Sequence, residues 1–226
     1  MRVVVTGSSA GMGLAAAKKF LNQGHEVIGI DILPVHKDIV TNPFFSESYT
    51  HYIANIVDRD ELPDLDGVEI LVNNAGVQGS GRDVDINLKG LMNVTEKYAI
   101  NNPYIKSVLN QASASAHMGT EFGEYVASKG GVIAYTKWTA KEIAKYGATC
   151  NSLSFGGVST ELNKPVMNDP ELWAQIMDET PLRRWATTEE IAEWAYFLAV
   201  TNRFCTGQNI LVDGGEAINY HFVWKD

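Results

Sequence analysis

Short runs of β-branched and aliphatic residues alternate along the chain with longer segments in which apolar residues recur at helical spacing. Such alternation is typical of right-handed βαβ units, which build a parallel sheet covered by helices on both faces. The sequence therefore predicts an α/β fold in three layers, with a doubly wound parallel sheet of about seven strands. The runs that predict strands are Val3–Thr6, Glu26–Asp31, Thr50–Asn55, Val68–Asn73, Ser107–Gln111, Thr149–Phe155 and Asn209–Val212.

Several of the intervening helices can be placed from the residues that mark where a helix begins or ends. The helix expected at Met12–Asn22 is rich in alanine, and the one at Val126–Tyr146 is long and stops before a glycine. A capping box at 187–190 opens a third helix that runs to about residue 199. The stretch 160–185 lacks strand character. We expect a single domain over residues 1–226, with a substrate lid at about 160–185.

Composition and charge exclude several classes of partner. The 226 residues, 45% hydrophobic and 20% charged, are those of an ordinary globular domain. A formal net charge of −9 argues against nucleic acid, because no basic stripe is present to neutralise phosphates. Cys150 and Cys205 are far apart and the five histidines are scattered, so no metal site is expected. No apolar run is long enough for a membrane span, and no signal peptide precedes the first strand, which predicts a cytoplasmic protein.

A glycine-rich loop, Thr6-Gly7-Ser8-Ser9-Ala10-Gly11-Met12-Gly13, follows the first predicted strand and opens the first predicted helix. Glycines there permit a tight turn and let the backbone approach a pyrophosphate, which then lies on the helix N-terminus. A loop of this kind can also be a simple turn. Its place between strand and helix favours phosphate binding and a Rossmann fold.

The second predicted strand ends on an acidic residue, Asp31, which lies 18 residues after Gly13. A carboxylate at this position accepts hydrogen bonds from ribose hydroxyls and repels a 2′-phosphate. The alternative is an ordinary solvated loop aspartate. Neither Ala10 nor Ile32 supplies a cation to hold a 2′-phosphate. The pattern predicts NAD rather than NADP as the cofactor.

Tyr125 and Lys129 are four residues apart in a predicted helix, so their side chains lie on one face. A nearby ammonium favours the phenolate and lowers the pKa of the tyrosine toward neutrality, which suits an acid/base. Such a pair is also common on solvent-facing helices. Two further polar residues support a catalytic role: Ser113, 12 residues before Tyr125 at the end of a predicted strand, and Asn87, where another helix begins.

Taken together, these motifs resemble those of the short-chain dehydrogenase/reductase family, in its compact single-domain branch. The resemblance runs from Thr6 to about Gly215. The matching motifs are T-G-x-x-x-G-x-G at Thr6–Gly13, N-N-A-G at Asn73–Gly76, N-x-x-G at Asn87–Gly90, Y-x-x-x-K at Tyr125–Lys129 and the ending Val212-Asp213-Gly214-Gly215.

The resemblance implies a role for each matched residue. Tyr125 is then the acid/base, Lys129 lowers its pKa and bonds the nicotinamide ribose, and Ser113 steadies the substrate oxygen. Asn87 holds a water that relays protons from Lys129. Other positions are expected to contact the cofactor through the phosphates, the adenosine or the nicotinamide. These are Gly7, Ser9, Gly11, Met12, Gly13, Asp31, Ile32, Asn55, Ile56, Asn74, Ala75, Gly76, Val158 and Thr160.

The chain also departs from the family pattern. Phe155 stands where the family has proline before Gly156, and one residue fewer separates Ser113 from Tyr125, which makes Ser115 a rival for the serine role. The segments 55–68 and 76–87 are shorter than usual. Both shortenings affect an outer face and the rim of the substrate site.

The sequence predicts an NAD(H)-dependent oxidoreductase that interconverts a secondary alcohol and a ketone. A non-catalytic NAD-binding sensor on the same fold is the alternative, and an extended-branch sugar epimerase is a weaker one. The lid carries an apolar set that suits a hydrophobic ketone or merely packs the lid. Sterols, acyl thioesters and sugar alcohols all stay open as substrates. Large apolar residues on more than one side of the helix at 126–146 predict a homodimer or homotetramer.

Overall fold

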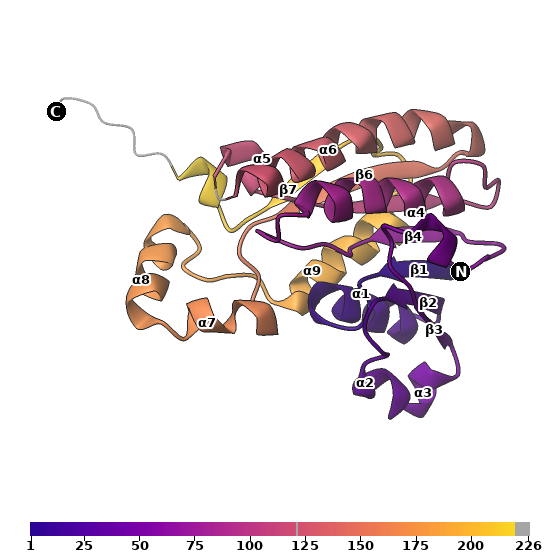
Figure 1. Ribbon diagram of the computed structural model, residues 1–226, viewed down its shortest axis with the longest axis horizontal. Coiled ribbons are helices and arrows are strands. Elements are labelled where there is room, and N and C mark those ends of the chain that lie inside the picture. Colours follow the sequence, from indigo (N-terminus) through magenta and orange to yellow (C-terminus); the bar gives the residue numbers. More distant parts are fainter. Residues whose placement is uncertain (121, 220–226) are drawn as a thin grey trace.

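Seven parallel strands form the centre of the computed structural model, which describes residues 1–120 and 122–219 (Figure 1). The strands are hydrogen-bonded in the order β3-β2-β1-β4-β5-β6-β7. Their bounds are β1 Arg2–Thr6, β2 Glu26–Asp31, β3 Tyr49–Ile53, β4 Ile70–Asn73, β5 Ser107–Ser113, β6 Thr149–Phe155 and β7 Asn209–Val212.

This strand order makes the sheet doubly wound. The chain builds outward from β1 to β3, returns to the other side of β1 for β4, and then builds outward to β7. The order reverses between β1 and β4, and the carboxyl ends of the strands leave a crevice at such a switch point. The predicted α/β fold of the Rossmann type with seven strands is confirmed.

Helices cover both faces of the sheet (Figure 1). The α-helices are α1 Gly11–Asn22, α2 Lys37–Val40, α3 Pro43–Ser46, α4 Leu91–Tyr98, α5 Ser115–Met118, α6 Gly123–Ile143, α7 Lys164–Met167, α8 Pro170–Glu179 and α9 Thr188–Tyr196. Short 3-10 segments are η1 Arg59–Glu61, η3 Ala144–Tyr146, η4 Glu161–Asn163 and η6 Glu216–Ile218, and π-helical segments are η2 Val84–Gly90 and η5 Phe197–Thr201.

Strand β1 illustrates how the sequence fills both cores. Val3 and Val5 point to one face and join the cluster under α1 and α9, whereas Val4 points to the other and joins the cluster under α4 and α6. Successive side chains of a strand face opposite ways, so a strand covered on both faces must be apolar throughout. Val3, Val4 and Val5 are fully buried.

Element boundaries differ from the sequence prediction in a few places. Strand β5 continues two residues further, to Ser113, because its last residues keep their register with β6. Helix α6 begins at Gly123, three residues earlier than predicted. The short α2 and α3 were not predicted; the side chains of His36 and Asn42 cap them. The segment 55–68, which the sequence indicates to be shorter than usual, contains η1 and no longer helix.

The start of α1 packs so closely on the end of β1 that residue 13 has no room for a side chain. A Cβ on Gly13 would lie 2.0 Å from the carbonyl oxygen of Gly7. We expect Gly13→Ala to lower the free energy of unfolding by about 2 kcal/mol, because backbone must move. Gly123→Ala is the matched control, since nothing lies within 4 Å of its Cβ position. Urea unfolding of both variants checks this; equal stabilities would contradict the close packing.

Candidate active site

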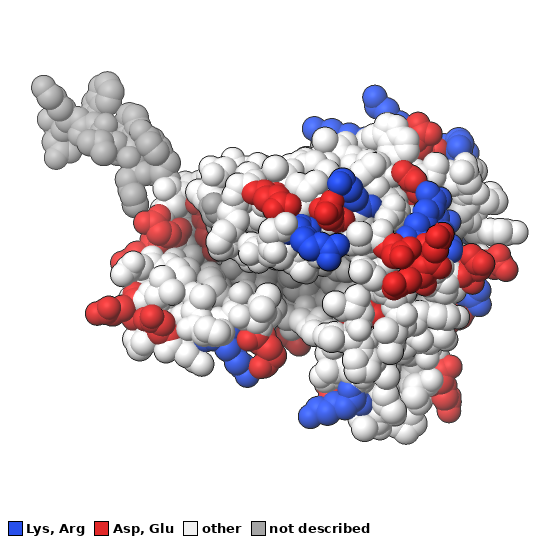
Figure 2. All heavy atoms as spheres, in the orientation of Figure 1, with Lys and Arg blue, Asp and Glu red and all other residues white. Residues whose placement is uncertain are grey.

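A cavity of about 1390 Å³ opens where the strands of the switch point end. Gly7 follows β1, Asn74 follows β4, Ser113 ends β5 and Gly156 follows β6, and all four line the cavity. Segment 160–185, with α7 and α8, closes one side. The space-filling view shows the surface hollowed between this segment and the body of the molecule (Figure 2).

The glycine-rich loop is tied directly to the end of β4. The Thr6 hydroxyl accepts hydrogen bonds from the backbone N–H groups of Asn74 and Ala75, at 3.0 and 3.1 Å. The Asn74 amide donates in return to the carbonyls of Thr6 and Gly7. Gly7 has a φ of +67° and Gly11 one of +51°, values that favour glycine. At Gly7 and Gly11 no side chain therefore separates the loop backbone from the cavity, as close approach of a pyrophosphate requires.

Asp31 presents its carboxylate at the end of the cavity formed by β2 and the glycine-rich loop. One oxygen accepts from the backbone N–H of Ser9 and the other from that of Leu33, both at 2.9 Å. These bonds fix the carboxylate and leave lone pairs for further donors. Among the described residues that line the cavity, the only lysine or arginine side chains are those of Arg82 and Lys129. Neither belongs to β2 or to the glycine-rich loop, the two segments that hold the Asp31 carboxylate.

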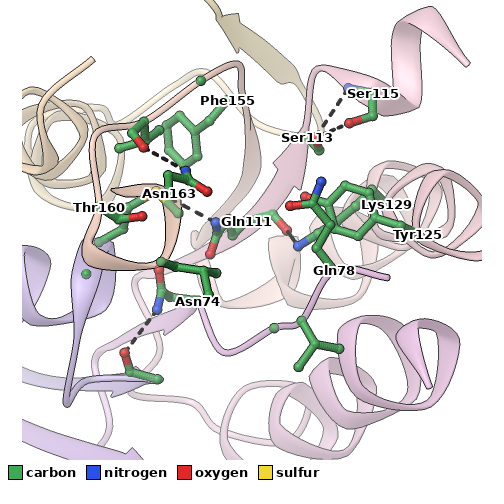
Figure 3. A pocket seen from close by; sticks show the side chains of 18 of the residues that line it. Asn74, Gln78, Gln111, Ser113, Ser115, Tyr125, Lys129, Phe155, Thr160 and Asn163 are labelled. Atoms are coloured by element: carbon green, nitrogen blue, oxygen red, sulfur yellow. Dashed lines mark hydrogen bonds between the residues drawn. The ribbon is translucent and has the colours of Figure 1, made fainter. Parts of the chain in front are cut away.

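Tyr125 and Lys129 project from α6 into the same cavity (Figure 3). The Lys129 ammonium lies 5.7 Å from the centroid of the Tyr125 ring and donates to the carbonyl of Gln111 at 3.0 Å. Only 3% of Lys129 is exposed. Burial disfavours the charged form and lowers the pKa of Lys129 to about 8.

Asn87 lies within η2 and supports the site from behind. Its side-chain oxygen accepts from the N–H of Val77 at 2.8 Å, and its amide donates to the Val77 carbonyl and the Ser128 hydroxyl. A Cβ on Gly76 would lie 2.8 Å from this oxygen and 3.6 Å from the Lys129 ammonium nitrogen. Asn87 thus fixes the backbone in front of Lys129. Its predicted role in holding a water stays a prediction.

Ser113 and Ser115, the two rivals for the serine role, lie together. Their hydroxyl oxygens are 2.7 Å apart, and the N–H of Ser115 donates to the Ser113 hydroxyl at 3.2 Å. Both residues are buried and both line the cavity. Ser113 ends β5 and Ser115 begins α5, so the sharp turn between them brings both hydroxyls to one place (Figure 3).

Most of the predicted residues line this cavity, but three do not. Ser9, Gly13 and Asn87 lie behind its wall, where Ser9 and Asn87 make hydrogen bonds and Gly13 makes a close backbone contact. Those that line it are Gly7, Gly11, Met12, Asp31, Ile32, Asn55, Ile56, Asn74, Ala75, Gly76, Ser113, Tyr125, Lys129, Val158 and Thr160.

Several lining residues had no motif to indicate them. Gln78, Gln111, Trp185 and Glu216 reach the cavity from four different segments of the chain. The Trp185 indole fills the space beside Gly157, since a Cβ there would lie 1.9 Å from its nitrogen. For Gln111, its place near the end of a strand could have indicated a cavity residue, because successive side chains of a strand face opposite sides of the sheet. The sequence contains no comparable signal for the other three residues.

Comparison with known proteins agrees with this geometry. A family model described as enoyl-(acyl carrier protein) reductase matches residues 7–216. The chain belongs to the short-chain dehydrogenase/reductase family. Among curated relatives, 3-oxoacyl-[acyl-carrier-protein] reductase of Thermotoga maritima is 30% identical, with 95% of this chain and 97% of that protein covered. Nodulation protein G of Rhizobium sp. strain N33 is also 30% identical, with 96% and 97% covered.

Solved structures of short-chain dehydrogenases share the fold over almost their whole length. An Agrobacterium tumefaciens protein, provisionally assigned as a 2-deoxy-D-gluconate 3-dehydrogenase and containing NADP, is 27% identical with a TM-score of 0.85, covering 96% of each chain. A 4-hydroxyisoleucine dehydrogenase complexed with NADH is 25% identical with a TM-score of 0.84, covering 97% of this chain and 99% of that one. Of these two proteins with the same fold, one therefore contains NADP and the other NADH.

Two kinds of feature are absent from the described residues, 1–120 and 122–219. No group of three or more His, Cys, Asp and Glu side chains there is placed to hold a metal ion. None of the helices in that part combines the length and apolar character needed to cross a membrane.

The buried ammonium of Lys129 should reduce the stability of the fold. The unfolded chain keeps this proton up to about pH 10.5, whereas the folded chain releases it near pH 8. At pH 7 the folded protein therefore bears the cost of a buried charge, and it recovers this free energy as the pH rises from about 8 to 10.5. We expect Lys129→Met to raise the free energy of unfolding at pH 7 by about 1–3 kcal/mol, a gain that shrinks over that pH range.

Urea unfolding at several pH values between 7 and 10.5 measures this effect. Lys141→Met, at an exposed position on the same helix, is the control and should show no such pH dependence. A Lys129→Met protein less stable than wild type at pH 7 would show that the bond to the Gln111 carbonyl outweighs the cost of burial.

Proposed function

We propose that this short-chain dehydrogenase is an NAD(H)-dependent oxidoreductase that interconverts a secondary alcohol and a ketone. One observation carries the proposal: Tyr125, Lys129 and Ser113 line the same cavity as the glycine-rich loop and Asp31. A cofactor held by its pyrophosphate at the loop and its ribose at Asp31 would extend along this cavity toward Tyr125. The exposed loop backbone and the fixed carboxylate suit those two groups.

Each catalytic side chain has a distinct task in this scheme. A bound nicotinamide supplies or accepts the hydride. The Tyr125 hydroxyl donates a proton to the carbonyl oxygen during reduction, and the Tyr125 phenolate accepts the proton of the alcohol during oxidation. The Lys129 ammonium favours the phenolate form of Tyr125, and burial strengthens this electrostatic effect. The Ser113 hydroxyl, paired with that of Ser115, holds the substrate oxygen in place.

The preference for NAD rests on Asp31. Neighbours within the fold bind NADP or NADH, so membership in the family does not decide the cofactor. A carboxylate fixed by Ser9 and Leu33, with no adjacent cation in the described cavity lining, would repel a 2′-phosphate. The side chains of Ile32 and Leu33, 67% and 51% exposed, make the surrounding rim apolar.

We further propose that segment 160–185 acts as a substrate lid. Within this segment, Trp173 of α8 packs on Trp185 edge to face, with ring centroids 4.9 Å apart. Leu162, Val166 and Ile176 of this segment line the cavity, as a lid over a partly apolar substrate requires.

A homodimer or homotetramer is also part of the proposal. Val132 and Ile143 of α6 are buried in the two cores next to this helix, and Tyr135 is partly buried against the core that holds Val132. Trp138 stacks on Tyr135 with ring centroids 5.1 Å apart and is itself 43% exposed. A large, exposed aromatic side chain on the outside of a helix suits a surface that a second subunit covers.

The cofactor preference predicts a difference in affinity. Wild type should bind NAD(H) at least about tenfold more tightly than NADP(H), which corresponds to about 1.4 kcal/mol. Asp31→Asn should reduce this difference in affinity, because it weakens the repulsion of the 2′-phosphate. Asp38→Asn, outside the cavity, is the control. Titration calorimetry with both cofactors checks this, and equal affinities in the wild type would refute the role of Asp31.

The acid/base role of Tyr125 predicts a large loss of turnover. Tyr125→Phe removes only the phenolic oxygen, so turnover should fall by roughly 10² to 10⁴ while NADH affinity barely changes. Tyr104→Phe, at a position that is 65% exposed, should retain both. Turnover is measured from the absorbance of reduced nicotinamide, and affinity from NADH titration.

Two results would count against this scheme. A Tyr125→Phe protein that keeps more than about a tenth of wild-type turnover would mean that another group transfers the proton. A wild type that binds NADH but reduces or oxidises no member of an alcohol and ketone panel would favour a non-catalytic sensor.

A further inference from the structure

The carboxylate of Glu216 reaches the cavity beside the strands that hold Ser113 and Gly156. Glu216 begins η6, just after the glycine pair that follows β7, and lines the cavity. One of its oxygens accepts from the N–H of Gly157 and from the hydroxyl of Thr180, each at 3.3 Å. The other lies 2.4 Å from the place where a Cβ on Gly156 would be.

The position of Glu216 is fixed by the turn before it. The Asp213 carboxylate accepts from the N–H groups of Gly215 and Ala217, at 2.9 and 2.8 Å. Gly214 and Gly215 adopt φ values of +65° and +95°, and Pro181 lies where a side chain on Gly215 would need space. The turn therefore presents Glu216 to the cavity in a defined place.

Glu216 lies within reach of a small substrate held at the serine. Ser113 of β5 is in register with Phe155 of β6, and Gly156 is the next residue. Neighbouring strands are about 4.8 Å apart and consecutive Cα atoms about 3.8 Å, so the carboxylate is on the order of 10 Å or less from Ser113. A substrate of five or six carbons spans such a distance.

The acidic side chains around this part of the cavity favour a substrate group that donates a hydrogen bond over one that carries a negative charge. Besides Glu216, three other acids of this region, Glu161, Asp178 and Glu179, line the cavity. The first two have ion-pair partners, Lys164 and Arg183, whereas Glu179 accepts from the neutral amide of Asn219. An anionic group of a substrate would be repelled here, and a hydroxyl or ammonium group would be attracted.

We propose that Glu216 is a specificity-determining residue that accepts a hydrogen bond from a second polar group of the substrate. The substrate is then a secondary alcohol or its ketone that carries a hydroxyl or ammonium group a few bonds from the reacting carbon. This inference rests on the proposed oxidoreductase function. Apolar lid residues such as Leu162 and Val166 contact the carbon chain between the two polar ends.

Three secondary alcohols of equal length test the proposal with NAD⁺: hexan-2-ol, hexane-1,5-diol and 6-aminohexan-2-ol. Wild type should show at least about tenfold higher kcat/KM for the diol or the amino alcohol than for hexan-2-ol. Glu216→Leu should abolish this preference. Glu216→Gln keeps an acceptor without the charge, so it should retain preference for the diol but lose it for the amino alcohol. The two variants thereby separate a hydroxyl from an ammonium as the favoured donor.

Two controls make the outcomes distinct. Glu171→Gln changes a carboxylate of α8 outside the cavity lining and should keep the wild-type preference. NADH affinity is measured for every variant. The inference is wrong if wild type prefers hexan-2-ol, if Glu216→Leu keeps the wild-type preference, or if the Glu216 variants lose NADH affinity in proportion to activity. A wild type that binds NADH and oxidises none of the three alcohols contradicts this inference, whereas the proposed function is refuted only if the wider alcohol and ketone panel also shows no turnover.

Discussion

The close contact between the glycine-rich loop and the ends of β1 and β4 is the constraint on which the rest of the structure depends. The carbonyl of Gly7 occupies the space beside Gly13, and the hydroxyl of Thr6 binds the backbone that follows β4. These short-range contacts hold the switch point of the sheet open as a crevice. Every other part of the site is arranged around that crevice, including Asp31, whose carboxylate binds the N–H of Ser9 in the same loop.

Burial of Lys129 links stability to chemistry. Burial of Lys129, which is 3% exposed, lowers the stability of the folded state, yet in the proposed mechanism the same low-dielectric surroundings strengthen the effect of its ammonium on Tyr125. The Gln111 carbonyl holds this ammonium, and Asn87 holds the backbone in front of it through Val77. The motifs that contain Lys129 and Asn87 are far apart in the chain but adjacent in the fold. Lys129 carries the charge, and Asn87 holds the backbone next to it.

The cavity wall on the proposed substrate side is built differently from the wall on the proposed cofactor side. Trp185 fills the space next to Gly157, and Glu216 approaches Gly156, so the glycines after β6 make room for side chains from later segments. Phe155 takes the place of the proline that the family pattern has there, and its carbonyl accepts from the N–H of Ala114, which keeps β6 in register with β5. The wall at the glycine-rich loop therefore depends on backbone geometry, and the wall after β6 on these individual side chains.

The sequence by itself determined the order of strands and helices, the Rossmann sheet, the glycine-rich loop and the Tyr125–Lys129 pair. Those features are local, because periodicity and motif spacing encode them within a few residues. Only the tertiary structure decided that Ser115 lies against Ser113, that Asn87 acts from behind the cavity wall, and that Glu216 enters it. Each of these depends on contacts between segments that are distant in the chain or on a turn whose direction the local pattern does not specify, such as the one that joins β5 to α5.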